Sequence, residues 1–148
     1  MISGREFLTL AETWSHGSGE AEWRCAVSRA YYAAFHESRV LLNELGFVVP
    51  RADLAHAFLW RRLENSGVPT LAKVGANLSF LRRERNKADY DIELNVAQPT
   101  ALKSVAVATD MISSLTRLSD SDRQQATEAM RVYERDVLRE TTWRNRPR

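Results

Sequence analysis

Apolar residues recur at intervals of three and four positions along every long segment of this chain, and this spacing is typical of amphipathic helices. No segment alternates apolar and polar residues as a half-buried strand would. The clearest helical segment runs from about Glu20 to Leu45, and its apolar face comprises Trp23, Val27, Ala30, Tyr31, Ala34, Phe35, Leu41, Leu42 and Leu45. The periodicity therefore predicts an all-α fold.

Capping and turn residues predict where the helices begin and end. Ser3 followed by Glu6 is a capping-box pattern that opens a first helix, and Gly46 closes the second helix just after its last turn. Further helices are expected over about 52–65, from a cap at Thr70 to about Asp91, from Pro99 in a first turn, and after a cap at Ser119 or Ser121. Short loops between such helices predict an antiparallel bundle of five to six helices, one domain over residues 1–140, and a basic flexible tail over residues 141–148.

The composition restricts the classes of protein without selecting one. The chain has 148 residues, enough for one domain, and its net charge is only +2 although its pI is about 8.9. A global charge this small does not by itself indicate nucleic acid. Cys25 is the single cysteine, so the chain has no internal disulfide, and a reducing cytoplasm is expected. The sequence has no apolar run long enough for a membrane span and no signal peptide at its start.

The segment after Thr70 contains an arginine where an apolar residue is expected. The apolar stripe of this segment is formed by Leu71, Val74, Leu78 and Leu81, and it continues by helical steps to Arg85, Ala88 and Ile92. Because burying an unpaired guanidinium is costly, Arg85 must be paired internally, face a protein interface or line a cleft that receives an anion. Asp89, four residues further on, is a possible partner within the helix.

Basic residues surround Arg85 on the same segment. Arg82, Arg83 and Lys87 form a basic patch that only Glu84 opposes locally. Guanidinium groups suit phosphate because they donate two parallel hydrogen bonds to it. The alternative is a solvated charged face with one internal pair between Arg85 and Asp89. Spacing alone leaves both interpretations open.

Two blocks of sequence resemble one known family. Residues 28–36, Ser-Arg-Ala-Tyr-Tyr-Ala-Ala-Phe-His, and residues 85–91, Arg-Asn-Lys-Ala-Asp-Tyr-Asp, together with His56, resemble the HEPN proteins, in particular their small stand-alone prokaryotic branch. The resemblance implies a compact, usually dimeric helical bundle. It also implies RNA as the ligand, because many members are metal-independent endoribonuclease toxins paired with a minimal nucleotidyltransferase antitoxin. Their motif is an Arg followed at four to six residues by a His, and two copies form one cleft at the dimer interface.

Only half of that motif is present here. Arg85 and Asn86 match its beginning, but Tyr90, Asp91 and Ile92 occupy the positions for the His. Members with Ala-Asp-Tyr at this place often lack the His. Metal-free cleavage needs a base whose pKa is near neutral, and tyrosine, with a reference pKa of about 10, is a poor one. We therefore expect weak or absent cleavage, with Arg85, Asn86 and Tyr90 as the remaining motif residues.

Other residues complete the set of candidates. His36 is the preferred substitute for the missing base, and His56 is a second one, although for each the favoured interpretation is a histidine satisfied at a helix contact. Tyr31 and Tyr32 leave their helix in different directions, so one is expected in the core and the other to bind Asp89 or stack on a base. The predicted RNA-binding residues are Arg82, Arg83, Lys87 and Tyr32. The sequence has no zinc-ligand pattern and no glycine-rich phosphate loop, so no metal or cofactor is predicted.

Two functions remain open at this point. The first is an RNA-binding protein of a prokaryotic toxin–antitoxin or defence system, with or without metal-independent endoribonuclease activity. The second is a non-catalytic helical interaction module that binds a nucleotidyltransferase-like antitoxin or serves as an accessory subunit of a defence complex. The basic patch favours the first function, whereas the missing histidine favours the second. A homodimer in the cytoplasm is expected in either case.

Overall fold

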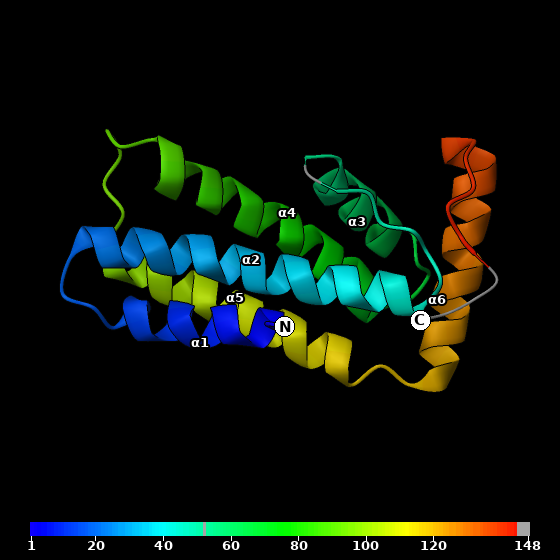
Figure 1. Ribbon diagram of the computed structural model, residues 1–148, viewed down its shortest axis with the longest axis horizontal. Helices are drawn as coiled ribbons and strands as arrows, with labels where there is room; N and C mark the ends of the chain where they lie inside the picture. The colour runs from blue at the N-terminus through cyan, green and yellow to red at the C-terminus, as the bar shows by residue number, and fades with distance from the viewer. Residues whose placement is uncertain (52, 145–148) are drawn as a thin grey trace. The chain divides into compact units, whose positions relative to one another are not determined.

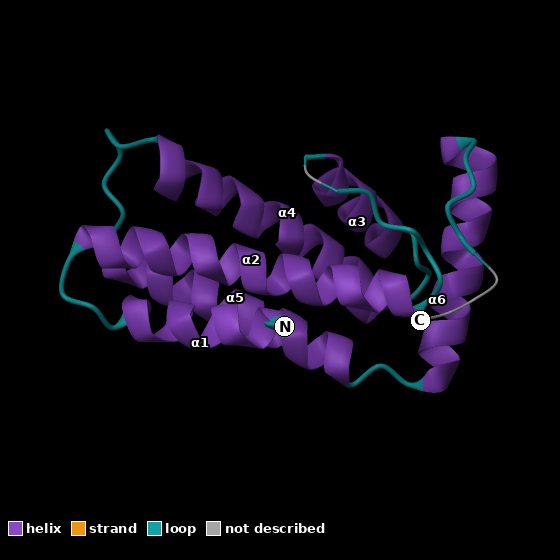
Figure 2. Cartoon of the chain, viewed as in Figure 1, coloured by secondary structure: helices purple, strands orange, loops and turns teal. Residues whose placement is uncertain are grey.

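The computed structural model describes residues 1–51 and 53–144, and its regular structure is helical (Figures 1 and 2). The single strand-like pairing in these residues is an isolated antiparallel bridge between Phe47 and Trp143. The predicted all-α fold is therefore confirmed. In chain order the helices are α1 (Gly4–Ser15), α2 (Glu20–Glu44), α3 (Leu54–Glu64), α4 (Pro69–Tyr90), α5 (Gln98–Thr116), α6 (Asp120–Tyr133) and a short π-helix, η1 (Glu134–Leu138).

The helices begin close to the predicted capping residues. The Glu6 carboxylate accepts a hydrogen bond from the Ser3 N–H at 2.8 Å, as the capping-box pattern predicted. Ser119, rather than Ser121, caps α6, because its hydroxyl accepts the Asp122 N–H at 3.0 Å. Thr70 lies inside the first turn of α4, which begins one residue earlier. The predicted start of the third helix, near 52, is at a residue outside the described part, and α3 begins at Leu54.

The end of α2 follows from a single glycine. Gly46 adopts a φ of +105°, a conformation that residues with a Cβ rarely adopt. Its N–H donates to the Asn43 carbonyl at 3.1 Å, and the Phe47 N–H donates to the Leu42 carbonyl at 3.0 Å. These two bonds form a Schellman motif, which satisfies carbonyls that the helix end would otherwise leave unpaired. The predicted role of Gly46 is confirmed.

The chain divides into two compact units. The first comprises Met1–Glu37 and Asn77–Ser113, and the second comprises Ser38–Ala76 and Ser114–Arg148. In the first unit, α1 contacts α2 through stacked rings of Phe7 and His36, whose centroids are 5.4 Å apart. Gln98 at the start of α5 donates to the Ser15 carbonyl at the end of α1 at 3.0 Å. One cluster of its core contains small residues that let helices approach closely: Ala26, Val27, Ala88, Val96 and Ala101.

A buried ion pair lies at the centre of the second unit. Arg62 on α3 is 1% exposed and Glu134 on η1 is 2% exposed, and Arg62 Nη2 lies 2.7 Å from Glu134 Oε2. The same guanidinium binds Glu140 at 2.7 Å, and its Cζ lies 3.4 Å from the centroid of the Phe58 ring. The Thr142 hydroxyl and N–H both donate to the Glu134 carboxylate. Arg62 therefore joins α3 to η1 and to the segment that follows η1.

The segment after η1 differs from the prediction. A flexible tail was expected from residue 141, but residues 141–144 are held in place. The Val48 N–H donates to the Thr142 carbonyl at 3.1 Å, the Arg144 N–H donates to the Gly46 carbonyl at 2.7 Å, and Trp143 Nε1 donates to the Leu45 carbonyl at 3.0 Å. Helical periodicity does not reveal a segment that is held by backbone pairing, so these hydrogen bonds could not be predicted from it. The rest of the predicted tail, 145–148, lies outside the described residues.

The buried ion pair generates a prediction for stability. We expect Arg62→Ala to lower the free energy of unfolding by roughly 3–5 kcal/mol, because Glu134 would remain charged and buried without its main counter-ion. Urea denaturation followed by circular dichroism measures this change. The matched control is Arg61→Ala at the adjacent, exposed position, where a change within about 1 kcal/mol is expected. Equal losses in the two variants would contradict the role assigned to Arg62.

Candidate functional site

Residues 28–36 and 85–91 meet in the first unit, where α2 and α4 pack against each other in opposite directions. The Ser28 hydroxyl on α2 donates to Asp89 Oδ2 on α4 at 3.1 Å. Arg85 Nε lies 2.9 Å from the same oxygen, although its N–H is not aligned for a hydrogen bond. Arg29 Nη2 donates to the Ser28 hydroxyl at 3.3 Å. Asp89 thus connects the blocks, and the internal pair predicted between Arg85 and Asp89 is present.

Within the described residues, the terminal nitrogens of Arg85 donate their hydrogen bonds to uncharged oxygens. Nη1 donates to the Asn86 side-chain carbonyl at 3.0 Å. Nη2 donates to the Tyr32 hydroxyl at 2.7 Å and to the Tyr90 hydroxyl at 3.4 Å. The Arg85 side chain is 19% exposed, and two of the partners of this edge, Asn86 and Tyr90, are exposed. One carboxylate therefore neutralises the Nε side of Arg85, while the Nη edge retains capacity for an anion.

Arg85 remains a cation in this environment. Burial alone lowers the pKa of its guanidinium, but the neighbouring Tyr32, Asp89 and Tyr90 outweigh that effect and raise the pKa above its usual value. Its Cζ also lies 5.2 Å from the centroid of the Tyr32 ring and 5.3 Å from that of Tyr90. At these distances the ring faces attract the positive charge. The site therefore presents a fixed positive charge between two aromatic rings.

The two adjacent tyrosines have different positions, as predicted. Tyr31 is buried, and burial raises its pKa to about 12, although Arg82 and Arg85 oppose that shift. Tyr32 lies between two guanidiniums, because Arg29 Cζ is 5.0 Å from its ring centroid. The Tyr32 hydroxyl accepts a hydrogen bond from Arg85, while the Ser28 hydroxyl donates to Asp89. Sequence reasoning missed Ser28 because a serine inside a helix carries no local signal of its partner.

The two candidate histidines lie in different units. His36 belongs to the first unit, and its ring stacks at 6.2 Å on Tyr32, the residue that also binds Arg85. It is thus the histidine that shares a contact residue with Arg85. His56 is buried in α3 of the second unit. The ring contacts of His36 with Phe7 and Tyr32 agree with the alternative interpretation of this residue as part of a helix contact.

Arg24 is a positioning residue that the sequence did not indicate. Its guanidinium donates to four backbone carbonyls at and beyond the end of α4, those of Lys87, Ala88, Asp91 and Leu94. Its Nε also lies 2.9 Å from Glu20. A cation is favourable at the carbonyl end of a helix because it satisfies unpaired acceptors and complements the helix dipole. Arg24 therefore holds the last turn of α4, which carries Asn86 and Tyr90.

The remaining residues of the predicted patch are more open to solvent. Arg83 and Lys87 are exposed, Arg82 is half-buried, and Lys87 Nζ lies 3.7 Å from Glu84. Ile92 was expected to continue the apolar stripe, but it lies beyond the end of α4 and is 81% exposed. That expectation was wrong because the helical spacing ends at Tyr90. The basic patch is therefore a solvated face beside the more enclosed Arg85.

Comparison with known proteins does not add an assignment. No protein-family model matches the chain, and no curated protein or solved structure is significantly similar to it. Within the described residues, none of the helices combines the length and the apolar character that a membrane span needs. The same residues contain no group of three or more His, Cys, Asp or Glu side chains arranged to hold a metal ion.

The contacts of Arg24 generate a prediction about the end of α4. We expect Arg24→Ala to lower the free energy of unfolding by roughly 1.5–3 kcal/mol, because several carbonyls lose a charged donor. The Asp91 and Leu94 amides, which close the turns after α4, should exchange their hydrogens faster. Hydrogen exchange monitored by NMR measures this effect. Arg24→Lys, which retains the positive charge, should lower the free energy of unfolding by less than Arg24→Ala does. Unchanged exchange of both amides in Arg24→Ala would show that Arg24 does not hold this turn.

Proposed function

We propose that this chain is an RNA-binding protein of a prokaryotic toxin–antitoxin or defence system, and that it binds a backbone phosphate of single-stranded RNA at Arg85. The observation that carries the proposal is the uneven pairing of the Arg85 guanidinium. A carboxylate lies beside Nε, whereas the hydrogen bonds of Nη1 and Nη2 within the described residues go to the neutral oxygens of Asn86, Tyr32 and Tyr90. The resemblance to the HEPN family, in which this arginine belongs to the RNA site, agrees with the proposal.

A phosphate can replace part of the neutral contacts of Arg85. Asn86 and Tyr90 are both exposed, so their side chains can move aside without opening the core. A charge-assisted bond from a guanidinium to phosphate is roughly twice as strong as a bond to a neutral oxygen. Asp89 and Tyr32 then keep the guanidinium in its orientation while its Nη edge binds the ligand. Phosphate binding at Arg85 is thus favourable and requires little rearrangement of α2 or α4.

The surroundings of Arg85 suit a single-stranded nucleic acid. Tyr90 is 67% exposed and offers a ring on which an unpaired base can stack, since every base has an aromatic face. Arg83 and Lys87 on the same helix contribute positive charge along the path of the strand. Double-stranded RNA hides its base faces and is recognised mainly by shape. An aromatic ring next to a phosphate-binding arginine therefore favours a single strand.

RNA binding should depend on Arg85 more than on any other arginine of this face. We expect Arg85→Ala to weaken binding of a single-stranded RNA oligonucleotide by roughly tenfold to a hundredfold, the loss typical of a charged hydrogen bond. Fluorescence anisotropy with the labelled RNA measures the affinity at low and high salt. Arg117→Ala, at an exposed arginine of the second unit, is the matched control and should bind as the wild type does. Equal affinities of a folded Arg85→Ala and the wild type would refute the proposal.

Cleavage is a separate question, and residue 90 offers a test of it. The Tyr90 hydroxyl lies 3.4 Å from Arg85 Nη2, so a side chain at this position reaches the guanidinium. We expect weak or no cleavage by the wild type in EDTA. Tyr90→His should raise cleavage by roughly a hundredfold or more, because histidine supplies a base whose pKa is near neutral. Gel analysis of labelled RNA measures the rate, and Tyr90→Phe, which adds no base, is the control. If Tyr90→His binds RNA but cleaves it no faster than the wild type does, this site binds RNA and does not cleave it.

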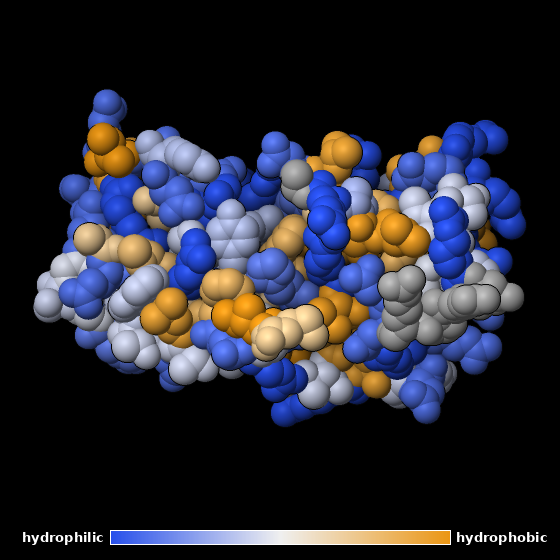
Figure 3. Space-filling model, in the orientation of Figure 1, coloured by the Kyte–Doolittle hydropathy of each residue, from blue (hydrophilic) through white to orange (hydrophobic). Residues whose placement is uncertain are grey.

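The second candidate function, a protein-interaction module, is favoured by a different observation. Three exposed apolar side chains lie at and just after the end of α4. They are Tyr90, Ile92 and Leu94, and their exposed fractions are 67%, 81% and 50%. Figure 3 displays apolar surface on the segment that follows α4. Neighbouring exposed apolar side chains are typical of protein contacts, and a second copy of the chain or a nucleotidyltransferase-like antitoxin would cover them. Failure of the wild type to bind any RNA in the anisotropy experiment would favour this function.

A further inference from the structure

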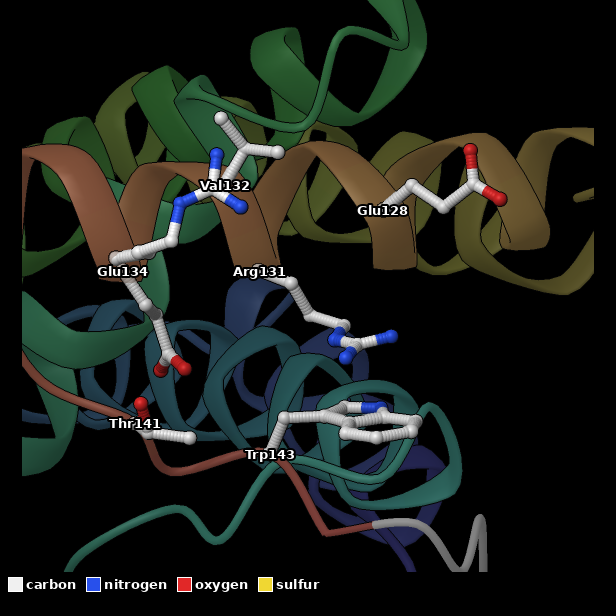
Figure 4. A pocket seen from close by; sticks show the side chains of 7 residues that line it. Glu128, Arg131, Val132, Glu134, Thr141 and Trp143 are labelled. Carbon is white, nitrogen blue, oxygen red and sulfur yellow. The ribbon is translucent and has the colours of Figure 1, made fainter.

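The second unit contains a cavity of about 360 Å³ that the proposed RNA site does not use (Figure 4). It lies between the end of α6, the π-helix η1 and the segment that follows η1. Both acidic and basic side chains line it, together with a threonine and a tryptophan. The residues that matter here are Glu128, Arg131, Glu134, Arg135, Thr141 and Trp143. A volume of this size is at the lower end of the range for small-molecule sites, about 300–1,000 Å³.

Arg131 is held in this cavity by an aromatic ring rather than by a carboxylate. Its Cζ lies 3.8 Å from the centroid of the Trp143 ring, and Figure 4 shows the guanidinium directly over the indole. The indole is itself fixed, because Nε1 donates to the Leu45 carbonyl at 3.0 Å and the Trp143 backbone bridges to Phe47. Stacking covers one face of the guanidinium but leaves the N–H groups in its plane available. Arg131 is therefore orientated before any ligand arrives.

Neighbouring arginines are paired differently. Arg123 on α6 lies 3.0 Å from Glu44, and Arg135 on η1 lies 2.8 Å from Asp136. Within the described part of the chain, no carboxylate oxygen lies within 4.0 Å of the Arg131 guanidinium. Among the described residues, Arg131 is thus a cation that no carboxylate pairs directly.

The acidic residues of the cavity do not take the place of a ligand. The Glu134 carboxylate is bound by Arg62 at 2.7 Å and by Thr142, so its oxygens are already engaged within the protein. The Glu128 side chain extends along α6 away from Arg131 and Trp143, as Figure 4 shows. Figure 4 shows Thr141 on the far side of the Glu134 carboxylate from Arg131, and the Arg135 guanidinium is paired with Asp136, so the donors available to an anion beside Trp143 are those of Arg131. A guanidinium suits phosphate because it donates two parallel hydrogen bonds to it.

We propose that this cavity binds the phosphate group of a small phosphorylated molecule, with Arg131 stacked on Trp143 as its main ligand residue. Arg131 donates two parallel hydrogen bonds to the phosphate. The remaining volume accommodates a group of about the size of a sugar, as in a mononucleotide. This site consists of residues of the second unit alone and does not depend on the proposed binding of RNA at Arg85.

The experiment titrates the full-length chain with inorganic phosphate and with adenosine monophosphate. Two-dimensional NMR follows the indole N–H of Trp143, assigned by its disappearance in Trp143→Phe, and therefore reports on this cavity alone. We expect saturable shifts of this resonance in the wild type and in the control Arg117→Ala. Arg131→Ala should weaken the binding at least tenfold. Arg131→Lys, which keeps the charge but loses the stacked, bidentate guanidinium, should also bind more weakly than the wild type.

Three results would overturn the proposal. The first is a wild-type indole resonance that neither ligand shifts. The second is unchanged affinity in folded Arg131→Ala, or, if that variant does not fold, in Arg131→Lys; thermal denaturation establishes which of them is folded. The third is an equal affinity for acetate, which would indicate a carboxylate site instead of a phosphate site.

Discussion

Partly buried and fully buried arginines impose the main constraint on this fold, because a guanidinium cannot lose its charge and must find partners wherever it is removed from water. Three of them join segments that are distant in sequence. Arg24 joins α2 to the end of α4, Arg85 joins α4 to Tyr32 on α2, and Arg62 joins α3 to η1. The apolar faces bring helices together without fixing how far one slides along another. The directional contacts of these arginines fix how far one helix is shifted along its neighbour.

The kind of partner separates structural arginines from those available to a ligand. Arg62 is saturated by two carboxylates and an aromatic ring, and it is almost fully buried, so no anion can reach it without unfolding the segment after η1. Arg85 has one carboxylate on its Nε side and neutral oxygens on its Nη side. Arg131 has an aromatic ring and, among the described residues, no carboxylate partner. Along this series progressively less of the positive charge is paired with a carboxylate, so more of it is available to an anion.

The fold was largely predictable from the sequence because each helix carries its own periodicity and its own caps. Gly46, Ser119 and the pair formed by Arg85 and Asp89 are local signals, separated from their partners by a few residues. Contacts between α2 and α4 join residues more than fifty positions apart, so spacing along the chain could not predict the bond between Tyr32 and Arg85 or the clamp formed by Arg24. The pairing of residues 141–144 with residues 46–48 was missed for a related reason, since backbone hydrogen bonds leave no side-chain pattern.

The contacts of Tyr90 limit how tightly the proposed RNA site can bind. Its ring lies 5.3 Å from the Arg85 guanidinium and its hydroxyl accepts a hydrogen bond from the same group. A base that stacks on Tyr90, or a phosphate that takes over the Nη edge of Arg85, must weaken one of these contacts. The free energy of RNA binding at this position is therefore only the difference between the new and the old interactions. Because the new interaction involves phosphate charge, that difference decreases as salt screens it, and binding at Arg85 should be moderate in affinity and sensitive to ionic strength.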